Sequence, residues 1–425
     1  MFDSLFVIDN SGSVIIEKHW KQVLSRRVID EFVVQVQGYP IQQEAPPVLY
    51  IEGYYMLYIS RHDLLFVSAV QTEVAPSSVF FFLHQIVELL YDYFGGMSEQ
   101  ILKENFVIVY ELLEELVDYG SPYITEPCLL KEMIPPPSLL ASMMNAVSIG
   151  TQFGTKLPTG YASTVPWRST GLKYTNNEIF FDVVEELDVI MDRNGKIVAG
   201  AIFGDILCTS KLSGMPDLLL TLGNKTAIAD GMSSLHPCVR VGRYERDRTL
   251  SFVPPDGAFR LMEYNVPIHS QTQLPILVKP TLKWKRSGGK LDISIHPKIP
   301  SERMIDQLVI TANLPTEVLS IRTNPTIGRC SFDPTSKVFT WTIGKMAANL
   351  TTSGLAQFTG YLVTENAAEL SKRSKNIVFN VDFRINMHSV SGIRIDSLAV
   401  QNEGYTPFKG GRGYTKTGRF QIRTY

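Results

Sequence analysis

The first 140 residues mix apolar periods typical of strands with others typical of helices. Apolar runs at Phe2–Ile8 and Val14–Lys18 flank the turn residues Asp9–Gly12, which predicts a β-hairpin. Two further strands are expected near Tyr54–Ser60 and Leu64–Val70.

Helical spacing of apolar residues occurs in three segments of the same region. They are Trp20–Val36, Ser77–Phe94, which a Ser-rich cap opens, and Ser98–Asp118, which is followed by Gly120. Strands that come first and helices that come last on about 140 residues predict an α+β domain.

A linker separates this domain from a second part with a different character. Pro135-Pro136-Pro137 ends the domain, and the stretch to about Val165 is rich in Ser, Thr, Gly and Ala, with Lys156 as its one charge. We therefore expect a domain at 1–140, a linker at 141–165 and an all-β sandwich at 166–425. The strand-like runs of the last part are Phe180–Met191, Lys196–Cys208, Leu218–Leu222, Thr249–Val253, Phe259–Tyr264, Ile276–Trp284, Leu291–Ile295, Gln307–Ala312, Lys337–Ile343, Asn376–Ile385 and Ile393–Val400.

The first of these strands carries an unusual pairing of side chains. Its period of two places Ile179 and Phe181 on one face, and Phe180 and Asp182 on the other. A carboxylate beside a phenyl ring suits an aromatic hydroxyl better than a metal or a phosphate. Alternatively, both phenylalanines are core residues, and Asp182 caps a turn or pairs with a nearby Arg.

Composition and charge narrow the class of protein. The chain of 425 residues is 44% hydrophobic and contains no run of about 18 uncharged apolar residues, so we expect two or three globular domains without a membrane-spanning helix. The four cysteines are far apart, which favours reduced thiols. We also expect a cytoplasmic protein.

Charge divides unequally between the two halves. Residues 1–140 hold 7 Lys and Arg against 19 Asp and Glu, whereas residues 166–425 hold 32 against 23. The basic half could face anionic lipid or an acidic protein. Alternatively, the two halves simply have different solvated surfaces.

Motifs of enzymes and metal sites are missing from the sequence. It contains no phosphate-binding GxxxxGK[ST] loop, no HExxH pair and no GxSxG nucleophile turn. Asp192-Arg193-Asn194-Gly195 resembles the start of a calcium loop but lacks the distal carboxylate, so we interpret it as a hairpin turn. We therefore expect no enzyme, no metal site, no cofactor and no nucleic-acid partner.

Nine stretches along the whole chain carry a family resemblance. Together they resemble the medium (mu) subunits of heterotetrameric clathrin-type vesicle adaptors, most closely those of the third adaptor class. The stretches are Trp167–Asp182, Phe2–Phe6, Glu17–Trp20, Gln71–Val74, Val107–Glu115, Leu212–Asp217, Ser251–Gly257, Pro407–Gly410 and Lys416–Thr424.

The resemblance implies an architecture and a set of partners. It implies a longin-like N-terminal domain in the core of a complex with two large subunits and one small subunit. It also implies an elongated β-sandwich, the mu-homology domain, that binds Tyr-x-x-Φ signals in cargo tails, where Φ is a bulky apolar residue. Such a subunit acts at the cytosolic face of Golgi and endosomal membranes, next to anionic lipid, and sorts cargo toward lysosomes or vacuoles.

The resemblance also implies roles for particular residues. The tyrosine pocket would consist of Phe180, Asp182 and Arg412, and the peptide would pair with the strand that holds Gly410 and Gly411. The Φ pocket would consist of Ile179, Phe181, Ile395 and Leu398.

Two positions depart from the pattern of other adaptor classes. Gly410 stands where those classes carry a Trp, and Thr209 stands where some carry a Lys. Both departures predict a lower peptide affinity at an unchanged location. Gly410 favours a second hypothesis, a mainly structural subunit whose basic domain contacts anionic membrane and whose peptide site is weak.

Overall fold

The structure is a computed structural model that divides into two compact units, Met1–Thr170 and Gly171–Tyr425. It describes residues 2–39, 45–137, 165, 167–168, 171–229, 232–268, 272–285, 288–347, 356–364 and 377–424. The predicted linker at 141–165 lies outside the described residues except for Val165. No helix in these ranges is long and apolar enough to cross a membrane.

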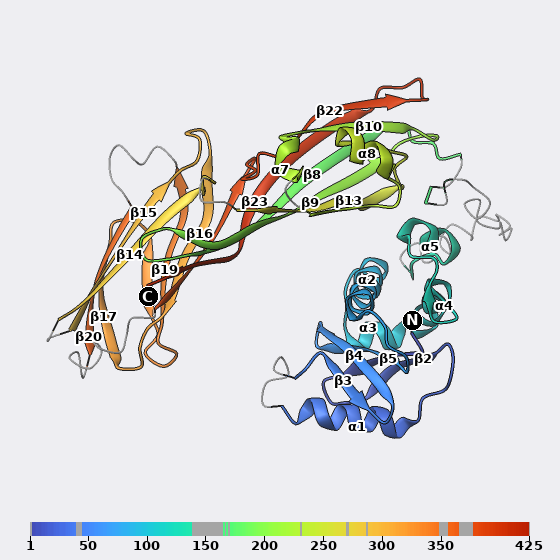
Figure 1. Ribbon diagram of the computed structural model, residues 1–425, viewed down its shortest axis with the longest axis horizontal. Coiled ribbons are helices and arrows are strands. Elements are labelled where there is room, and N and C mark those ends of the chain that lie inside the picture. The colour runs from blue at the N-terminus through green and yellow to red at the C-terminus, as the bar shows by residue number, and fades with distance from the viewer. Residues whose placement is uncertain are drawn as a thin grey trace, which may run out of the picture. The chain divides into compact units, whose positions relative to one another are not determined.

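A five-stranded antiparallel sheet forms the centre of the N-terminal unit, with the strand order β2-β1-β5-β4-β3. Helix α1 packs on one face of the sheet and the later helices pack on the other (Figure 1). The elements are β1 (Ser4–Asp9), β2 (Val14–His19), α1 (Arg26–Gln37), β3 (Val48–Ile51), β4 (Tyr54–Arg61), β5 (Leu64–Val70), α2 (Pro76–Phe94), α3 (Glu99–Glu104), α4 (Phe106–Leu116), β6 (Val117–Asp118), β7 (Ser121–Pro122) and α5 (Pro127–Met133).

Strand β1 shows why the sheet is covered on both faces, because all six of its residues are buried. Successive side chains of a strand point to opposite faces. Leu5 and Val7 join the apolar cluster that includes Phe82 of α2, whereas Phe6 joins the cluster that includes Phe32 of α1. The predicted α+β, longin-like domain is confirmed.

Several predicted helix boundaries were wrong. Helix α1 begins at Arg26 rather than at Trp20, because Trp20 packs on the cluster at the opposite face of the sheet. Helix α2 opens with Pro76 at its first turn instead of a serine cap. The stretch from Ser98 to Asp118 contains two helices, since Asn105 leaves helical geometry and its amide donates to the Ile101 carbonyl.

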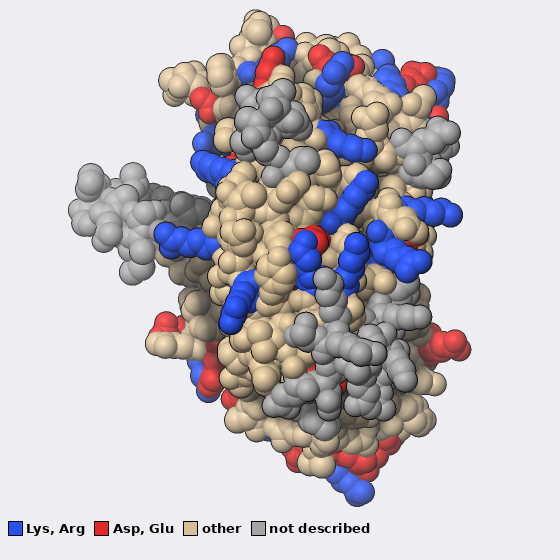
Figure 2. All heavy atoms as spheres, turned by 90° about the vertical axis from the view of Figure 1, so that its left-hand side faces the viewer, with Lys and Arg blue, Asp and Glu red and all other residues tan. Residues whose placement is uncertain are grey.

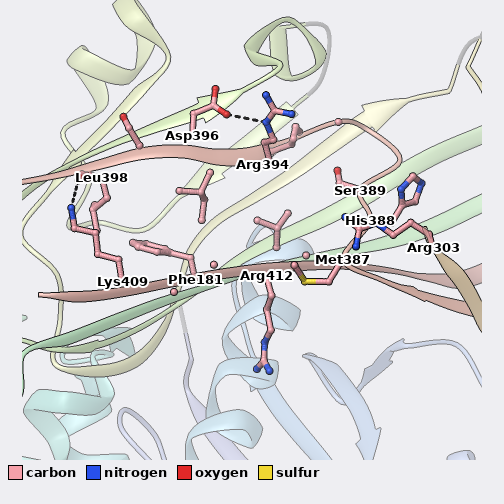
Figure 3. Close-up of a pocket in the computed structure, with 18 of the residues that line it drawn as sticks. Phe181, Arg303, Met387, His388, Ser389, Arg394, Asp396, Leu398, Lys409 and Arg412 are labelled. Atoms are coloured by element: carbon pink, nitrogen blue, oxygen red, sulfur yellow. Dashed lines mark hydrogen bonds and ion pairs between the residues drawn. The ribbon is translucent and has the colours of Figure 1, made fainter. Parts of the chain in front are cut away.

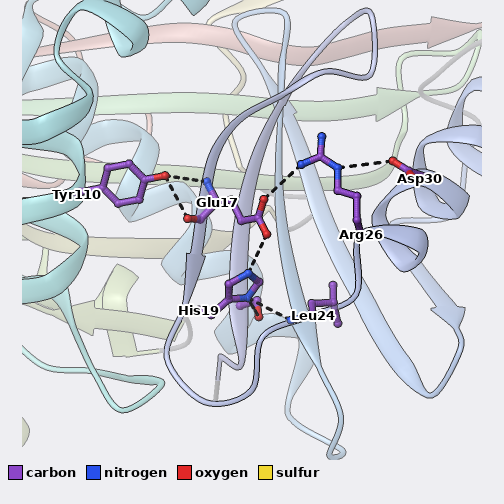
Figure 4. A network of polar contacts seen from close by, with 7 residues as sticks. Glu17, His19, Leu24, Arg26, Asp30 and Tyr110 are labelled. Carbon is purple, nitrogen blue, oxygen red and sulfur yellow. Dashed lines mark hydrogen bonds and ion pairs between the residues drawn. The ribbon is translucent and has the colours of Figure 1, made fainter.

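A polar network around Glu17 fastens β2, an edge strand, to the surrounding helices (Figure 4). The Tyr110 hydroxyl of α4 donates to the Glu17 carbonyl at 3.1 Å and accepts from the Glu17 amide at 3.3 Å. The Glu17 carboxylate lies 2.9 Å from His19 Nε2 and 3.3 Å from Arg26 of α1. These bonds use polar groups that an edge strand otherwise leaves open to another chain.

The described strands of the C-terminal unit form three sheets. A nine-stranded sheet has the order β11-β13-β9-β8-β23-β21-β16-β19-β18, a three-stranded sheet has the order β12-β10-β22, and a four-stranded sheet has the order β14-β15-β20-β17. The strands are β8 (Glu178–Met191), β9 (Ile197–Lys211), β10 (Asp217–Gly223), β11 (Met232–Leu235), β12 (Thr249–Phe252), β13 (Gly257–Pro267), β14 (Ile276–Lys285), β15 (Gly288–Pro297), β16 (Met304–Asn313), β17 (Val318–Pro325), β18 (Arg329–Phe332), β19 (Val338–Ala347), β20 (Ala356–Thr364), β21 (Val378–Asn386), β22 (Arg394–Gln401) and β23 (Phe408–Arg423). Two short helices are α7 (Lys225–Ala229) and α8 (Val241–Asp247).

The nine-stranded sheet runs through the whole unit, and each smaller sheet covers one end of it (Figure 1). Phe358 of β20 contacts Phe339 and Trp341 of β19, with ring centroids 4.9 Å and 5.6 Å apart, which joins the four-stranded sheet to the long one. The expected mu-homology β-sandwich is confirmed.

All eleven strands predicted from the apolar pattern fall on observed ones, but β11, β17, β18 and β20 were missed, and β23 was expected only from the family resemblance, which placed Gly410 and Gly411 on a strand. Of these five strands, β23 is the most important for the site. It contains four glycines and has no strict apolar alternation, so its own sequence pattern does not predict a strand. Its neighbours β8 and β21 hold it in place through backbone pairing.

Candidate functional site

The first candidate cavity lies on one face of the paired strands β8 and β23. These strands run parallel, and the register places Phe180 opposite Gly410 and Asp182 opposite Arg412. On the other side of β8, Thr209 of β9 stands opposite Phe180. A cavity of about 490 Å³ results. Its lining residues are Phe180, Phe181, Asp182, Thr209, Gly410, Gly411 and Arg412.

Asp182 and Arg412 form a two-pronged ion pair at this cavity. Arg412 Nε donates to Asp182 Oδ1 at 2.6 Å, and Arg412 Nη2 donates to Oδ2 at 2.9 Å. The hydrogen bond to Asp182 raises the pKa of Arg412 above its ordinary value. Each carboxylate oxygen has two lone pairs, so Asp182 can accept a further donor while it holds the guanidinium.

Phe180 and Phe408 form an exposed aromatic pair next to the ion pair. Their ring centroids are 5.8 Å apart, and the side chains are 37% and 66% exposed. A Cβ atom on Gly410 would lie 2.5 Å from the Phe180 ring, so that ring rests directly on the glycine backbone. Phe180 therefore occupies part of the space that a larger residue at position 410 would fill.

The second cavity, of about 580 Å³, opens on the opposite face of β23, toward β22. Figure 3 shows Phe181 on this side of the strand pair and Arg412 pointing to the other side. The Lys409 side chain reaches from β23 to β22, where its Nζ donates a hydrogen bond to the Leu398 carbonyl at 2.6 Å. In Figure 3, Leu398 and Phe181 lie near Lys409 at one end, and His388 and Arg303 lie at the other end. The apolar lining residues are Phe181, Val183, Ile393, Ile395 and Leu398, and the polar ones include Arg303, His388 and Arg394.

An open strand edge lies between the two cavities. Strand β23 pairs with β8 from Phe408 onward, but β21 pairs with β23 only from Tyr414 to Arg423. Within the described part of the chain, no strand pairs with the second edge of residues 408–413. The backbone groups along that edge can therefore bind an added strand.

A buried carboxylate fixes the loop that lines the far end of the second cavity. Glu185 is fully buried and accepts hydrogen bonds from Tyr264 Oη at 2.9 Å, Ser389 Oγ at 2.7 Å and the Val390 amide at 2.6 Å. The amide and hydroxyl of Ser391 also donate to it. Burial, together with the nearby Glu185 carboxylate, raises the pKa of Tyr264.

Comparisons with known proteins assign the chain to a family. Residues 165–424 match the Adaptor complexes medium subunit family, and residues 1–128 match the Clathrin adaptor complex small chain. Over 426 aligned residues, which cover 100% of both chains, the sequence is 41% identical to the AP-3 complex subunit mu-2 of Rattus norvegicus and 42% identical to the AP-3 complex subunit mu-1 of Homo sapiens. The chain belongs to the medium-subunit family of adaptor complexes.

The structural comparison agrees with this medium-subunit assignment. A chain in the homology model of the full-length AP-3 complex in an intermediate open conformation gives a TM-score of 0.62 at 18% identity, with 100% of both chains covered, which shows a shared fold. A medium subunit is an adaptor protein of vesicle transport and cargo sorting rather than an enzyme, as the resemblance predicted.

Within the described ranges, no group of three or more His, Cys, Asp or Glu in this medium subunit could hold a metal. The stretch Asp192–Gly195, interpreted from the sequence as a hairpin turn, is the β8–β9 turn, in which Asp192 Oδ1 accepts hydrogen bonds from the Asn194 and Lys196 amides at 2.8 Å.

The structure brings most of the predicted site residues of the medium subunit together. Ile179 is the exception, because it is fully buried and lines neither cavity. The first cavity contains Phe180, Asp182, Arg412, Gly410 and Gly411, and the second contains Phe181, Ile395, Leu398, Gly410 and Gly411.

Sequence reasoning missed several residues of the site. Phe408 and Lys409 belong to a stretch that carries the family resemblance, but they begin a strand without apolar alternation, so no role in the site was assigned to them. Val183 could have been found, because it shares a face with Phe181 in the predicted alternation. Glu185 breaks that alternation by placing a carboxylate on the buried face.

Proposed function

We propose that this medium subunit binds Tyr-x-x-Φ sorting signals of cargo tails by adding the peptide as a strand to the edge at residues 408–413. The observation that carries the proposal is a pair of cavities on opposite faces of one strand pair, with an open edge between them. Residues i and i+3 of an extended peptide point to opposite faces and lie about 10 Å apart. The tyrosine therefore enters the first cavity and Φ enters the second.

Side chains of the first cavity suit a phenol. The Asp182 carboxylate accepts a hydrogen bond from the tyrosine hydroxyl. A hydrogen bond to a charged group contributes about 1.5–3 kcal/mol. Phe180 and the Arg412 guanidinium offer flat surfaces on which the tyrosine ring can pack. The apolar side chains of the second cavity, Phe181 and Leu398 among them, suit a bulky aliphatic residue.

A calorimetric titration of the full chain with a Tyr-x-x-Φ peptide tests this proposal. We expect Asp182→Ser to abolish binding, and we expect peptides with Ala in place of Tyr or of Φ to bind far more weakly. Asp188→Ser is the matched control, because Asp188 lies on the same face of β8 but lines neither cavity. Unchanged affinity of the Asp182→Ser variant would refute the tyrosine assignment.

We further propose that the N-terminal unit packs against two large subunits and one small subunit in an adaptor complex. Large apolar side chains are exposed on this unit, which is typical of protein interfaces. Phe106 and Val107 of α4 are each 53% exposed, and Tyr119 is 74% exposed. The assembled complex would act at the cytosolic face of Golgi and endosomal membranes and sort cargo toward lysosomes or vacuoles.

A second candidate function is that of a mainly structural subunit whose C-terminal domain contacts anionic membrane. Gly410 and the existing Asp182–Arg412 ion pair favour it, because both leave less for a peptide tyrosine to gain. A flotation assay with liposomes separates the two functions. Binding that requires anionic lipid and is unaffected by peptide would support the structural role.

A further inference from the structure

The four-stranded sheet of the C-terminal unit has one apolar face and one outward face with a cationic row. Backbone register aligns Lys283 of β14 with Lys290 of β15, Lys290 with Tyr361 of β20, and Tyr361 with Arg322 of β17. Residues opposite each other in a sheet share a face, and neighbouring strands are about 4.8 Å apart. The four side chains therefore form a continuous row across all four strands.

Positive charge dominates this outward face. Lys279 adds a further cation on the same face of β14, four residues before Lys283. Asp292 of β15 is the acidic residue among the outward-facing residues that the register pairs. Its carboxylate lies 2.9 Å from Lys290 Nζ and raises the pKa of that lysine. Within the described residues, no ion pair engages Lys279, Lys283 or Arg322. Figure 2 shows this side of the unit, with Lys and Arg side chains spread over it and few acidic ones between them.

Exposed apolar and aromatic side chains accompany the cations. Tyr361, in the middle of the row, is 54% exposed, and Val363, the next outward residue of β20, is 39% exposed. Leu319 at the adjoining end of β17 is 44% exposed. Neither of the two cavities described above lies on this face. A tyrosine beside basic and aliphatic side chains on an open sheet suits a membrane interface better than a small ligand.

We infer that this basic sheet face, defined by Lys279, Lys283, Lys290, Arg322 and Tyr361, is a docking surface for an anionic membrane. The cations contact lipid phosphates and carboxylates, and the Tyr361 ring lies at the level of the headgroups. The inference adds a location to the membrane contact of the second candidate function. It uses the four-stranded sheet, whereas the peptide cavities lie at the β8–β23 pair.

Co-sedimentation of the full chain with phosphatidylcholine vesicles, with and without phosphatidylserine, tests the inference. We expect binding only to vesicles that contain phosphatidylserine. Each cation near an anionic surface contributes about fivefold to the partition coefficient, so Lys283→Gln with Arg322→Gln should lower it about thirtyfold. Tyr361→Ala should also lower it, and Tyr361→Phe should restore most of it.

Arg243→Gln with Arg246→Gln is the matched control, because it removes the same charge from helix α8 at the other end of the unit (Figure 1). Wild-type partitioning of this control supports the inference, and an equal loss in both double variants overturns it. If the Lys283 and Arg322 double variant binds vesicles as well as the wild type does, the proposed location is wrong, although the chain still binds membrane. If the wild-type chain binds equally with and without phosphatidylserine, both the proposed location and the contact with anionic membrane are refuted. Peptide titration of the same variants reports on the cargo site separately.

Discussion

Removal of the Glu185 side chain should destabilise the C-terminal unit far more than the same change at the adjacent residue. Glu185→Ala leaves the amides of half-buried Val390 and buried Ser391 without their carboxylate acceptor. An unsatisfied buried donor costs about 1–3 kcal/mol, so the two amides together cost about 4 kcal/mol. The three hydroxyl donors add less, because hydroxyls can rotate toward each other.

Thermal unfolding of the full chain, followed by circular dichroism, measures this loss. A cost of that size lowers the melting temperature of a unit of this length by about 8–16 °C. Glu185→Gln keeps the shape and one acceptor oxygen, so its melting temperature should fall between those of the wild type and the Ala variant. The Gln variant also keeps the prediction testable if the Ala variant does not fold.

Glu186→Ala provides the control on the opposite face of the same strand. Glu186 pairs with Lys416 at 2.7 Å, and both side chains are more than 40% exposed, so the pair contributes below about 1 kcal/mol. If the Glu185→Ala and Glu186→Ala variants melt at the same temperature, the buried network does not stabilise the unit as we argue.

Two further predictions follow from the site. Phe408→Ala removes the partner of the Phe180 ring, so we expect peptide affinity in titration calorimetry to fall by about 2- to 12-fold; Phe408→Tyr should retain affinity, and an Ala variant at wild-type affinity would exclude Phe408 from the site. Burial lowers the pKa of His388 below 6.5, despite the nearby Glu185 carboxylate, and Arg303 lowers it further. As the pH falls, His388 of the unfolded chain therefore takes up a proton before His388 of the folded chain does. The contribution of the neutral, buried His388 to the free energy of unfolding is intact above pH 6.5 and is lost as the pH falls through the folded-state pKa. The melting temperature of His388→Gln should therefore decline less than that of the wild type below pH 6.5, and equal declines would contradict the assignment.

Local pattern predicted much of the fold and one half of the site. The alternation of β8 placed Phe180 and Asp182 on the face opposite Phe181, because a half-buried strand carries its register in its own sequence. Strand β23 carries no such signal, and the positions of its glycines depend on pairing with β8. The contact between the Phe408 and Phe180 rings therefore became visible only with the tertiary structure. The ion pair between Asp182 and Arg412 joins residues 230 positions apart, which no local pattern encodes.

Strand β23 couples the candidate site to the integrity of the whole C-terminal unit. It lies between β8 and β21, so it joins β11-β13-β9-β8 to β21-β16-β19-β18 in one sheet. Without it the nine-stranded sheet would divide into two four-stranded sheets. Its first residues form the open edge and one wall of each cavity, and its later residues pair with β21. Because β8 and β23 are the first and last strands of the unit, the cavities depend on pairing between residues far apart in sequence, such as Asp182 and Arg412, 230 positions apart. Closing so long a segment of chain carries a large entropic cost, which slows the formation of such contacts.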